Sequence, residues 1–287
     1  MTGQSLVPQR CMILAVLFLV HIFAMGQTDR DRYIDVGKRK LHVDEAGITG
    51  PIVVFESGLG EDISTWKDVQ PDVAKFAHTV TYERAGIGKS DALAGARSMP
   101  QMVTDLHTML HNGKFAPPFI LVGHSLGGAL VQVFAATYPK EIAGLVLVDP
   151  EDGRLIDALK THMSESDWAN RQKALDAALP QFSPAQRAEL ALVTSSGKEM
   201  AELPALPQVP IVLLTGTLKN PEVPGNPLEQ DLKLELHKQF LAANPQTKQV
   251  LVPNSRHYIQ NDAPTTLIQA IHEVVAEAFA TGGSAGR

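Results

Sequence analysis

A serine framed by glycines stands between an apolar, strand-like segment and an apolar, helix-like one. Residues 119–122 are continuously apolar and run directly into residues 123–128, Gly-His-Ser-Leu-Gly-Gly. Glycines two residues before and after a serine fit a strand-to-helix turn that is too tight for larger side chains. Such a turn presents Ser125 as an exposed nucleophile and points the amide of Leu126 to where an oxyanion forms. The alternative is a glycine-rich turn whose serine has no chemical role.

Short apolar runs recur along the rest of the chain, with helical patterns between them. Runs typical of buried strands lie at 51–55, 79–82, 119–122, 145–148, 209–214 and 248–252. Apolar residues recur at helical spacing in 66–76, 98–112, 126–138, 229–243 and 264–280. This alternation predicts an α/β protein with a mostly parallel central sheet and helices on both faces. The alternating residues 32–46 predict a hairpin at the edge of that sheet.

The region from residue 149 to residue 208 breaks this alternation, because it contains no strand pattern. It predicts two or three helices, near 152–163, 165–179 and 184–196. We interpret it as a small helical lid, about 150–208, inserted after the sixth strand rather than as a separate domain.

Composition and charge exclude several classes of protein. The 287 residues are 44% hydrophobic and 20% charged, which is typical of a globular chain. The net charge is −6 and no basic block occurs, so we expect no nucleic-acid partner. A single cysteine excludes a disulfide framework within the chain and zinc sites built on several thiolates.

The N-terminus has the pattern of a secretory signal. Arg10 precedes the apolar residues 11–25, and Gly26 completes a cleavage site of small residues. The apolar run is shorter than the roughly 20 residues that a spanning helix needs. We therefore predict a signal peptide at 1–26, one folded domain at 27–287 and export to the periplasm or the extracellular space. The alternative is an uncleaved signal anchor, with residues 11–25 as a membrane tether.

Taken together, these motifs resemble the α/β-hydrolase superfamily over residues 32–281. Residues 55–60 (FESGLG) resemble the loop after its third strand, and 82–90 (YERAGIGKS) resemble its D-x-x-G-x-G-x-S turn, with Glu83 in place of the usual aspartate. Residues 255–264 resemble the late histidine loop and the helix after it. The resemblance implies the α/β-hydrolase fold and an esterase-like member with a serine nucleophile.

A serine hydroxyl needs a base to take its proton. The chain has ten histidines, and His257 lies in a loop after the last predicted strand, where the superfamily places the base. The alternative for His257 is an ordinary surface histidine. His124 lies inside the tight turn, where we expect it to pack or to shape the pocket.

The third member of a triad, the acid, is harder to assign. The superfamily usually places it after the strand before last, where this chain has Asn220, which carries no charge to balance an imidazolium. Some members take it from the end of the preceding strand, where this chain has Asp149. Asp149 is therefore the first candidate, and Asp152 and Glu222 are the alternatives. Asp149 could instead be a turn residue that caps the first helix of the lid.

The second oxyanion donor is expected from the loop after the third strand. By its position in that loop, the amide of Leu59 is the candidate partner of the Leu126 amide. Glu56, just before the loop, could either serve the core or hold the loop, and the sequence does not separate the two.

A serine nucleophile implies acyl transfer, so we expect hydrolysis of a small-molecule carboxylic ester through an acyl-enzyme. No metal or organic cofactor is implied. The apolar lid residues either line a pocket for the substrate or only cover the core. Lactonase, amidase and C–C bond hydrolase activities remain alternatives within the superfamily. Because of Asn220, a non-catalytic binding protein of the same fold is a further alternative.

Overall fold

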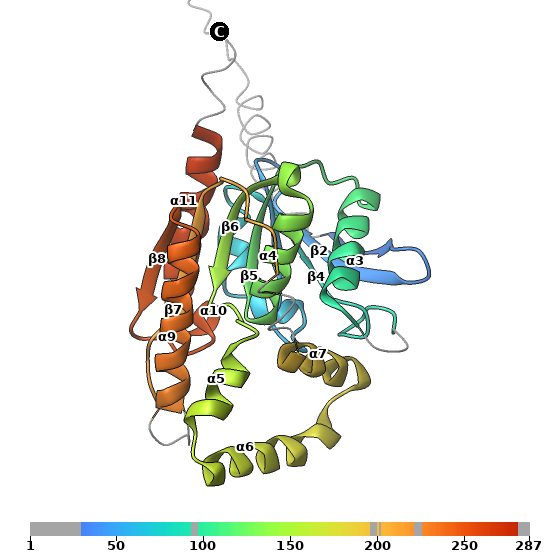
Figure 1. Cartoon of the computed structure of the whole chain (residues 1–287). Coiled ribbons are helices and arrows are strands. Elements are labelled where there is room, and N and C mark those ends of the chain that lie inside the picture. The colour runs from blue at the N-terminus through green and yellow to red at the C-terminus, as the bar shows by residue number, and fades with distance from the viewer. Residues whose placement is uncertain (1–29, 93–96, 196–199, 201, 221–225, 281–287) are drawn as a thin grey trace, which may run out of the picture.

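One sheet forms the centre of the molecule (Figure 1). The computed structural model describes residues 30–92, 97–195, 200, 202–220 and 226–280. Within them, eight strands pair in the order β1-β2-β4-β3-β5-β6-β7-β8. They are β1 (Arg30–Asp35), β2 (Lys40–Ala46), β3 (Ile52–Glu56), β4 (His78–Tyr82), β5 (Phe119–His124), β6 (Ile142–Val148), β7 (Ile211–Gly216) and β8 (Thr247–Val252).

The direction of the strands confirms the predicted sheet. β1 and β2 form an antiparallel hairpin at one edge, and β2 also runs antiparallel to β4. From β4 to β8, neighbouring strands are parallel. The carboxyl ends of these parallel strands therefore meet at one edge of the sheet, where open α/β sheets bind their ligands.

Helices cover both faces of the sheet (Figure 1). They are η1 (Ile63–Trp66), α2 (Gln70–Val73), α3 (Met99–Asn112), α4 (Leu126–Thr137), η2 (Pro139–Glu141), α5 (Leu155–His162), α6 (Glu165–Ala178), η3 (Leu179–Gln181), α7 (Pro184–Ser195), α9 (Asn226–Ala243), α10 (Ile259–Asp262) and α11 (Pro264–Ala280). Most lie close to their predicted ranges. The prediction of one helix over 66–76 is wrong, because the short η1 and α2 take its place. Pro71, in the first turn of α2, has no backbone N–H to continue a helix from η1.

The parallel strands are continuous apolar runs because both of their faces are buried. In β3, Val53 packs in one core with Trp66 and with Leu267 of α11. The next residue, Val54, packs in the opposite core with Leu106 of α3. Successive side chains point to opposite faces of a strand, so each run serves two cores.

The three helices α5, α6 and α7 follow β6 and precede β7, which confirms the helical lid after the sixth strand. Figure 1 shows them beyond the carboxyl-terminal edge of the sheet. In the opposite direction from the lid, α11 extends past the sheet (Figure 1). The lid therefore covers the edge at which the predicted site residues lie.

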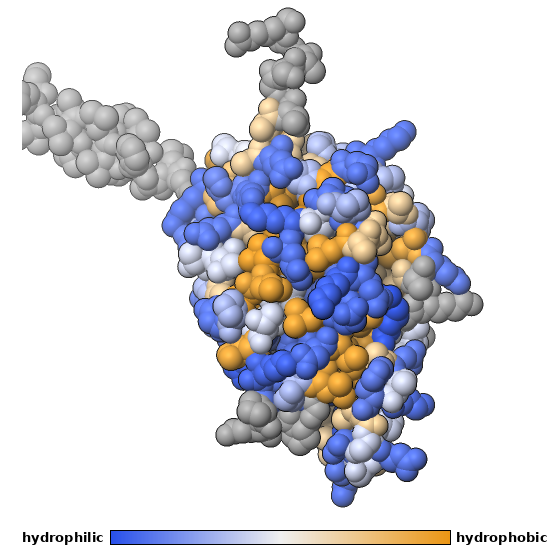
Figure 2. All heavy atoms as spheres, turned by 60° about the vertical axis from the view of Figure 1, so that its left-hand side comes forward, coloured by the Kyte–Doolittle hydropathy of each residue, from blue (hydrophilic) through white to orange (hydrophobic). Residues whose placement is uncertain are grey.

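The face of the molecule in Figure 2 mixes hydrophobic and hydrophilic residues, with hydrophobic ones in small groups between charged and polar ones. Across the described ranges, none of the helices is long and apolar enough to span a bilayer. The predicted signal peptide or anchor, residues 1–26, lies outside the described residues, so it stays a prediction.

Candidate active site

The strand-to-helix turn holds Ser125 in a strained conformation. Ser125 follows β5 and precedes α4 with φ 52° and ψ −119°, a region that residues with side chains rarely adopt. Its backbone N–H donates to the carbonyl of Val148 at the end of β6, at 3.1 Å. A Cβ atom on Gly127 would lie 2.1 Å from the carbonyl oxygen of Glu56, and one on Gly123 would lie 2.4 Å from the oxygen of Gly127. Steric exclusion therefore explains both glycines of the motif.

His257 meets Asp149 across the carboxyl-terminal edge of the sheet. The loop after β8 carries His257, and its Nδ1 lies 2.7 Å from Oδ2 of Asp149, the residue that follows β6. Asp149 itself has a positive φ of 43°, and its backbone N–H donates to the carbonyl of Leu214 in β7. The adjacent end of β7 thus fixes the turn that aims this carboxylate at the imidazole.

Asp149 has two further partners that the sequence analysis did not foresee. Lys233 of α9 places its Nζ 2.6 Å from Oδ2, and the backbone N–H of Gly216 donates to Oδ1 at 3.1 Å. The carboxylate is 0% exposed and the lysine side chain 6% exposed. Burial acts to raise the pKa of Asp149, but Lys233 and His257 outweigh it and lower that pKa to about 2. The carboxyl is therefore ionised at any pH at which the protein is expected to work.

The alternative acids have other surroundings. The carboxylate of Asp152 accepts hydrogen bonds from Nε and Nη2 of Arg154, at 2.9 and 2.6 Å. Asn220 lines a cavity together with His257, and its backbone N–H donates to Oδ1 of Asn226. Glu222 lies outside the described residues. Of the three candidate acids, the one in contact with His257 among the described residues is Asp149.

His124 supports the loop that carries His257. Its Nε2 donates to the carbonyl oxygen of His257 at 3.0 Å, and its Nδ1 lies 3.1 Å from Oε2 of Glu61. Burial lowers the pKa of His257, and the neighbouring His124 and Lys233 act in the same direction, whereas the hydrogen bond to Asp149 opposes them.

A buried arginine holds the loop that carries the predicted oxyanion donor Leu59. Arg84 donates through Nη1 to the carbonyl of Ser57 and through Nη2 to that of Gly58, both at 2.6 Å. Its Nη1 also donates to Glu56 at 2.7 Å. Glu56 is buried and accepts a hydrogen bond from the hydroxyl of Tyr82 as well. Glu56 therefore holds the loop through Arg84, which answers a question that the sequence left open.

The lid contributes a second group to the same loop. Glu189 of α7 is fully buried and accepts from Arg84 Nη2 and from the backbone N–H of Gly60, both at 2.8 Å. Arg97 Nη1 donates to the other carboxylate oxygen at 3.0 Å. Gly60 directly follows Leu59, so one lid carboxylate ties α7 to the candidate oxyanion loop.

A sequence-family model described as alpha/beta hydrolase fold matches residues 51–273. This match covers well over half of the chain and includes the elbow at Ser125, the Asp149 turn and the His257 loop. The chain belongs to the α/β-hydrolase superfamily.

Individual relatives agree with this membership. The uncharacterized protein YqjL of Bacillus subtilis is 28% identical over 234 residues, which cover 79% of this hydrolase and 85% of YqjL. Protein phosphatase methylesterase 1 of Mus musculus is 27% identical over 134 residues, but these span 44% of this chain and only 34% of the mouse protein. A solved thermophilic esterase from Thermogutta terrifontis superposes with a TM-score of 0.60 at 19% identity, covering 87% of this chain and 99% of the esterase. At that identity the likeness shows the fold alone.

A cavity of about 440 Å³ opens beside the His257–Asp149 pair of this hydrolase. Its described lining includes Lys233, Glu151 and Tyr258. A cavity of this size is within the range of small-molecule sites.

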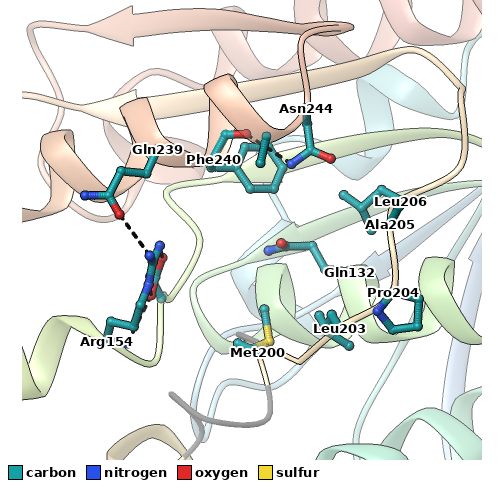
Figure 3. A pocket seen from close by; sticks show the side chains of 12 residues that line it. Gln132, Arg154, Met200, Leu203, Pro204, Ala205, Leu206, Gln239, Phe240 and Asn244 are labelled. Atoms are coloured by element: carbon teal, nitrogen blue, oxygen red, sulfur yellow. Dashed lines mark hydrogen bonds and ion pairs between the residues drawn. The ribbon is translucent and has the colours of Figure 1, made fainter.

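A separate cavity of about 380 Å³ lies farther along α4 and α9 (Figure 3). The side chains of Gln132, Phe240 and Arg154 border it, and Arg154 Nη1 donates to Oε1 of Gln239 at 2.9 Å. His257 is not part of its described lining, so we place the candidate active site in the cavity beside His257.

Proposed function

We propose that this α/β hydrolase is a serine hydrolase that cleaves a carboxylic ester. The observation that carries the proposal is the 2.7 Å contact between His257 Nδ1 and a buried, ionised Asp149, on the sheet edge at which Ser125 occupies a strained elbow. A base oriented by a carboxylate is the part of such a site that activates a serine hydroxyl.

The proposed reaction proceeds through an acyl-enzyme. His257 takes the proton of the Ser125 hydroxyl through Nε2 while Nδ1 remains bonded to Asp149. The serine oxygen attacks the ester carbonyl, and the amides of Leu59 and Leu126 stabilise the oxyanion. Leu126 is the first residue of α4, where a backbone N–H has no partner within the helix. His257 then protonates the departing alcohol, and water activated by the same base releases the acid.

The sequence relatives support hydrolysis at a carbonyl group. The name of protein phosphatase methylesterase 1 describes an ester hydrolase, and this protein is similar to part of this chain. Another relative, the putative carbamate hydrolase RutD of Cronobacter turicensis, is 29% identical over 38% of this chain and 42% of its own length. Both names describe hydrolysis at a carbonyl group, which is the chemistry that a serine elbow and an oxyanion loop provide.

The first test is labelling of the full-length protein with a fluorophosphonate, which reacts only with an activated serine. We expect the label on Ser125, located by mass spectrometry, and none on the Ser125→Ala variant. Asp149→Asn should slow labelling strongly, since a comparable substitution in a serine protease costs about 10⁴-fold in kcat. The matched control is Asp152→Asn. This variant removes the same charge three positions after Asp149, but from a carboxylate that is bonded to Arg154.

An unlabelled wild-type protein would refute the proposal and favour a non-catalytic binding protein of the same fold. Labelling that Asp152→Asn abolishes and Asp149→Asn retains would refute the assignment of the acid. If the wild-type protein is labelled, its activity is then measured on a panel of esters, lactones, amides and β-diketones. The panel separates ester hydrolysis from its alternatives within the superfamily.

A further inference from the structure

The cavity beside His257 has a neighbour under the lid. This second cavity, about 590 Å³, is lined by residues of α5, α6 and α7 and is largely apolar. Its apolar lining consists of Leu155, Ile156, Trp168, Leu175, Leu190 and Val193. Glu151, Leu155 and Glu229 line both cavities, so the two spaces meet at these residues. A substrate in the cavity beside His257 can therefore extend past Glu151 into an apolar space.

Glu151 is held beside the nucleophile by its backbone. It lies two residues after Asp149, and its N–H donates to the carbonyl of Ser125 at 2.9 Å. Between them, Pro150 packs against the elbow, since a Cβ atom on Gly128 would lie 2.6 Å from Pro150 Cβ. The turn from Asp149 to Glu151 is thus fixed on the elbow, and Glu151 and Glu229 are the acidic residues where the cavity beside His257 joins the apolar one.

The side chain of Glu151 lacks the partners that its neighbours have. Its Oε1 atom is buried and has no hydrogen-bond partner among the described residues. A buried polar atom without a partner costs free energy, and a ligand that donates a hydrogen bond to it inside the cavity would recover that free energy.

The other carboxylates around Glu151 form ion pairs. Asp149 pairs with Lys233, Glu229 with Arg171, and Asp152 with Arg154. The carboxyl of Glu151 is therefore the acidic group at this junction that forms no ion pair within the described part of the chain. An ammonium group that enters the cavities meets a carboxyl group that forms no ion pair among the described residues and becomes negatively charged when it ionises.

We propose that this hydrolase recognises esters that carry an ammonium group, which Glu151 binds while the ester lies at Ser125. The inference rests on the proposed ester hydrolysis and names its substrate class. The ammonium nitrogen donates to Oε1 of Glu151, and the alkyl chain between ammonium and ester contacts the apolar lining shared with the lid. A simple alkyl ester fills the same space but leaves the carboxyl unsatisfied.

The ionisation of Glu151 gives the proposal a pH signature. Burial raises the pKa of Glu151 to about 8; Lys233 opposes the rise, and Glu229, Asp152 and Asp149 add to it. The other charged or titratable groups of the two cavities are Arg171, Arg256, His257 and Tyr258. An alkylammonium remains charged up to about pH 10, so its binding should strengthen as pH rises through 8 and Glu151 ionises. A neutral ligand that accepts a hydrogen bond from the protonated carboxyl should show the opposite trend.

Two isosteric pairs of esters test the proposal. Methyl 6-aminohexanoate is compared with methyl heptanoate, and 6-aminohexyl acetate with heptyl acetate, because the position of the ammonium in the acyl or alcohol part is open. Rates are followed in a pH-stat. We expect kcat/KM to favour the ammonium ester by about ten-fold in at least one pair, as for a hydrogen bond between charged groups.

Variants separate recognition by Glu151 from general effects of charge. Glu151→Gln should abolish the preference in that pair. The control, Glu229→Gln, removes a carboxylate that lines the same cavities but is paired with Arg171, and it should keep most of the preference. No preference in either pair, or a preference that survives Glu151→Gln, would overturn the proposal.

Binding measured without turnover distinguishes failure of recognition from failure of catalysis. Calorimetry on the Ser125→Ala protein compares hexylammonium with hexanol, and we expect tighter binding of hexylammonium that Glu151→Gln removes. If Ser125 takes no fluorophosphonate but hexylammonium binds in this way, the proposed reaction fails and the recognition stands. If Ser125 is labelled but hexylammonium and hexanol bind alike, the recognition fails alone.

Discussion

Replacing Lys233 by methionine should raise the pH at which this hydrolase loses activity on the acid side. His257 acts as a base only while it is neutral. Its pKa lies below the ordinary histidine value of 6.5, chiefly because the ring is partly buried, and the Lys233 ammonium contributes in the same direction. Without Lys233, the repulsion between its ammonium and the imidazolium is lost, while the attraction of the Asp149 carboxylate remains. The pKa of His257 therefore rises. The acid limb of kcat/KM then moves to higher pH.

The size of the shift follows from the geometry. Lys233 Nζ and His257 Nδ1 lie 2.6 and 2.7 Å from the same oxygen of Asp149. The two nitrogens are thus within roughly 5 Å, where unit charges at an effective dielectric of about 20 interact by about 3 kcal/mol. The His257 side chain is 34% exposed, so water screens much of this interaction. We expect a shift of about 0.5 to 1 pH unit, since one pKa unit corresponds to about 1.4 kcal/mol.

The assay is kcat/KM for one ester as a function of pH, measured in a pH-stat for the wild type and the variants. Removing one partner of a buried ion pair costs about 3–5 kcal/mol, so thermal unfolding must first show that Lys233→Met is folded at the assay temperature. Lys233→Arg keeps the charge and should leave the acid limb near its wild-type position. Lys238→Met is the matched control, because this lysine of α9 is 69% exposed and pairs with Glu235 at the surface. A folded Lys233→Met protein whose acid limb is unchanged, or moves to lower pH, would refute the reasoning.

Two further predictions concern the oxyanion loop and the elbow. Glu189→Gln takes away the charge that two buried arginines share, so we expect a lower melting temperature, by the equivalent of about 3 kcal/mol, and a lower kcat with little change in KM. Calorimetry would measure the melting temperature and steady-state kinetics would measure kcat and KM. An unchanged kcat would show that the contact of α7 with the oxyanion loop does not affect catalysis. Gly127→Ala places a Cβ atom 2.1 Å from the carbonyl oxygen of Glu56, so the elbow cannot keep its geometry. Fluorophosphonate labelling of Ser125 should be lost, and labelling at the wild-type rate would contradict the steric argument.

Local sequence patterns predicted the elbow, the parallel strands and the lid. The spacing of Gly123, Ser125 and Gly127 acts within one turn, so steric exclusion alone predicts a strand before it and a helix after it. The parallel strands are visible as apolar runs because they are buried on both faces. The lid is visible as the region where such runs stop. The predicted helix at 66–76 failed because its apolar spacing is satisfied equally well by two short turns, which periodicity does not distinguish.

Local patterns could not identify the acid of the proposed triad. The sequence placed Asp149 at the end of an apolar strand and so made it a candidate, together with Asp152 and Glu222. Preferring Asp149 to Asp152 needed the distance to His257, a residue 108 positions away. Sequence spacing carries no information about that distance, because it depends on how β6 and β8 sit in the sheet.

Only the tertiary structure could reveal the charged groups that support this site. Lys233 lies 84 positions from Asp149, and Glu189 lies 105 positions from Arg84. In the sequence, each is one charged residue in an amphipathic helix, where a solvent-exposed position is the usual expectation. Each is buried because its helix packs against the carboxyl-terminal edge of the sheet, where an opposite charge already lies. Local sequence therefore defines the elbow and the strands, whereas burial and ion pairing arise from contacts between distant elements and exist only in the folded chain.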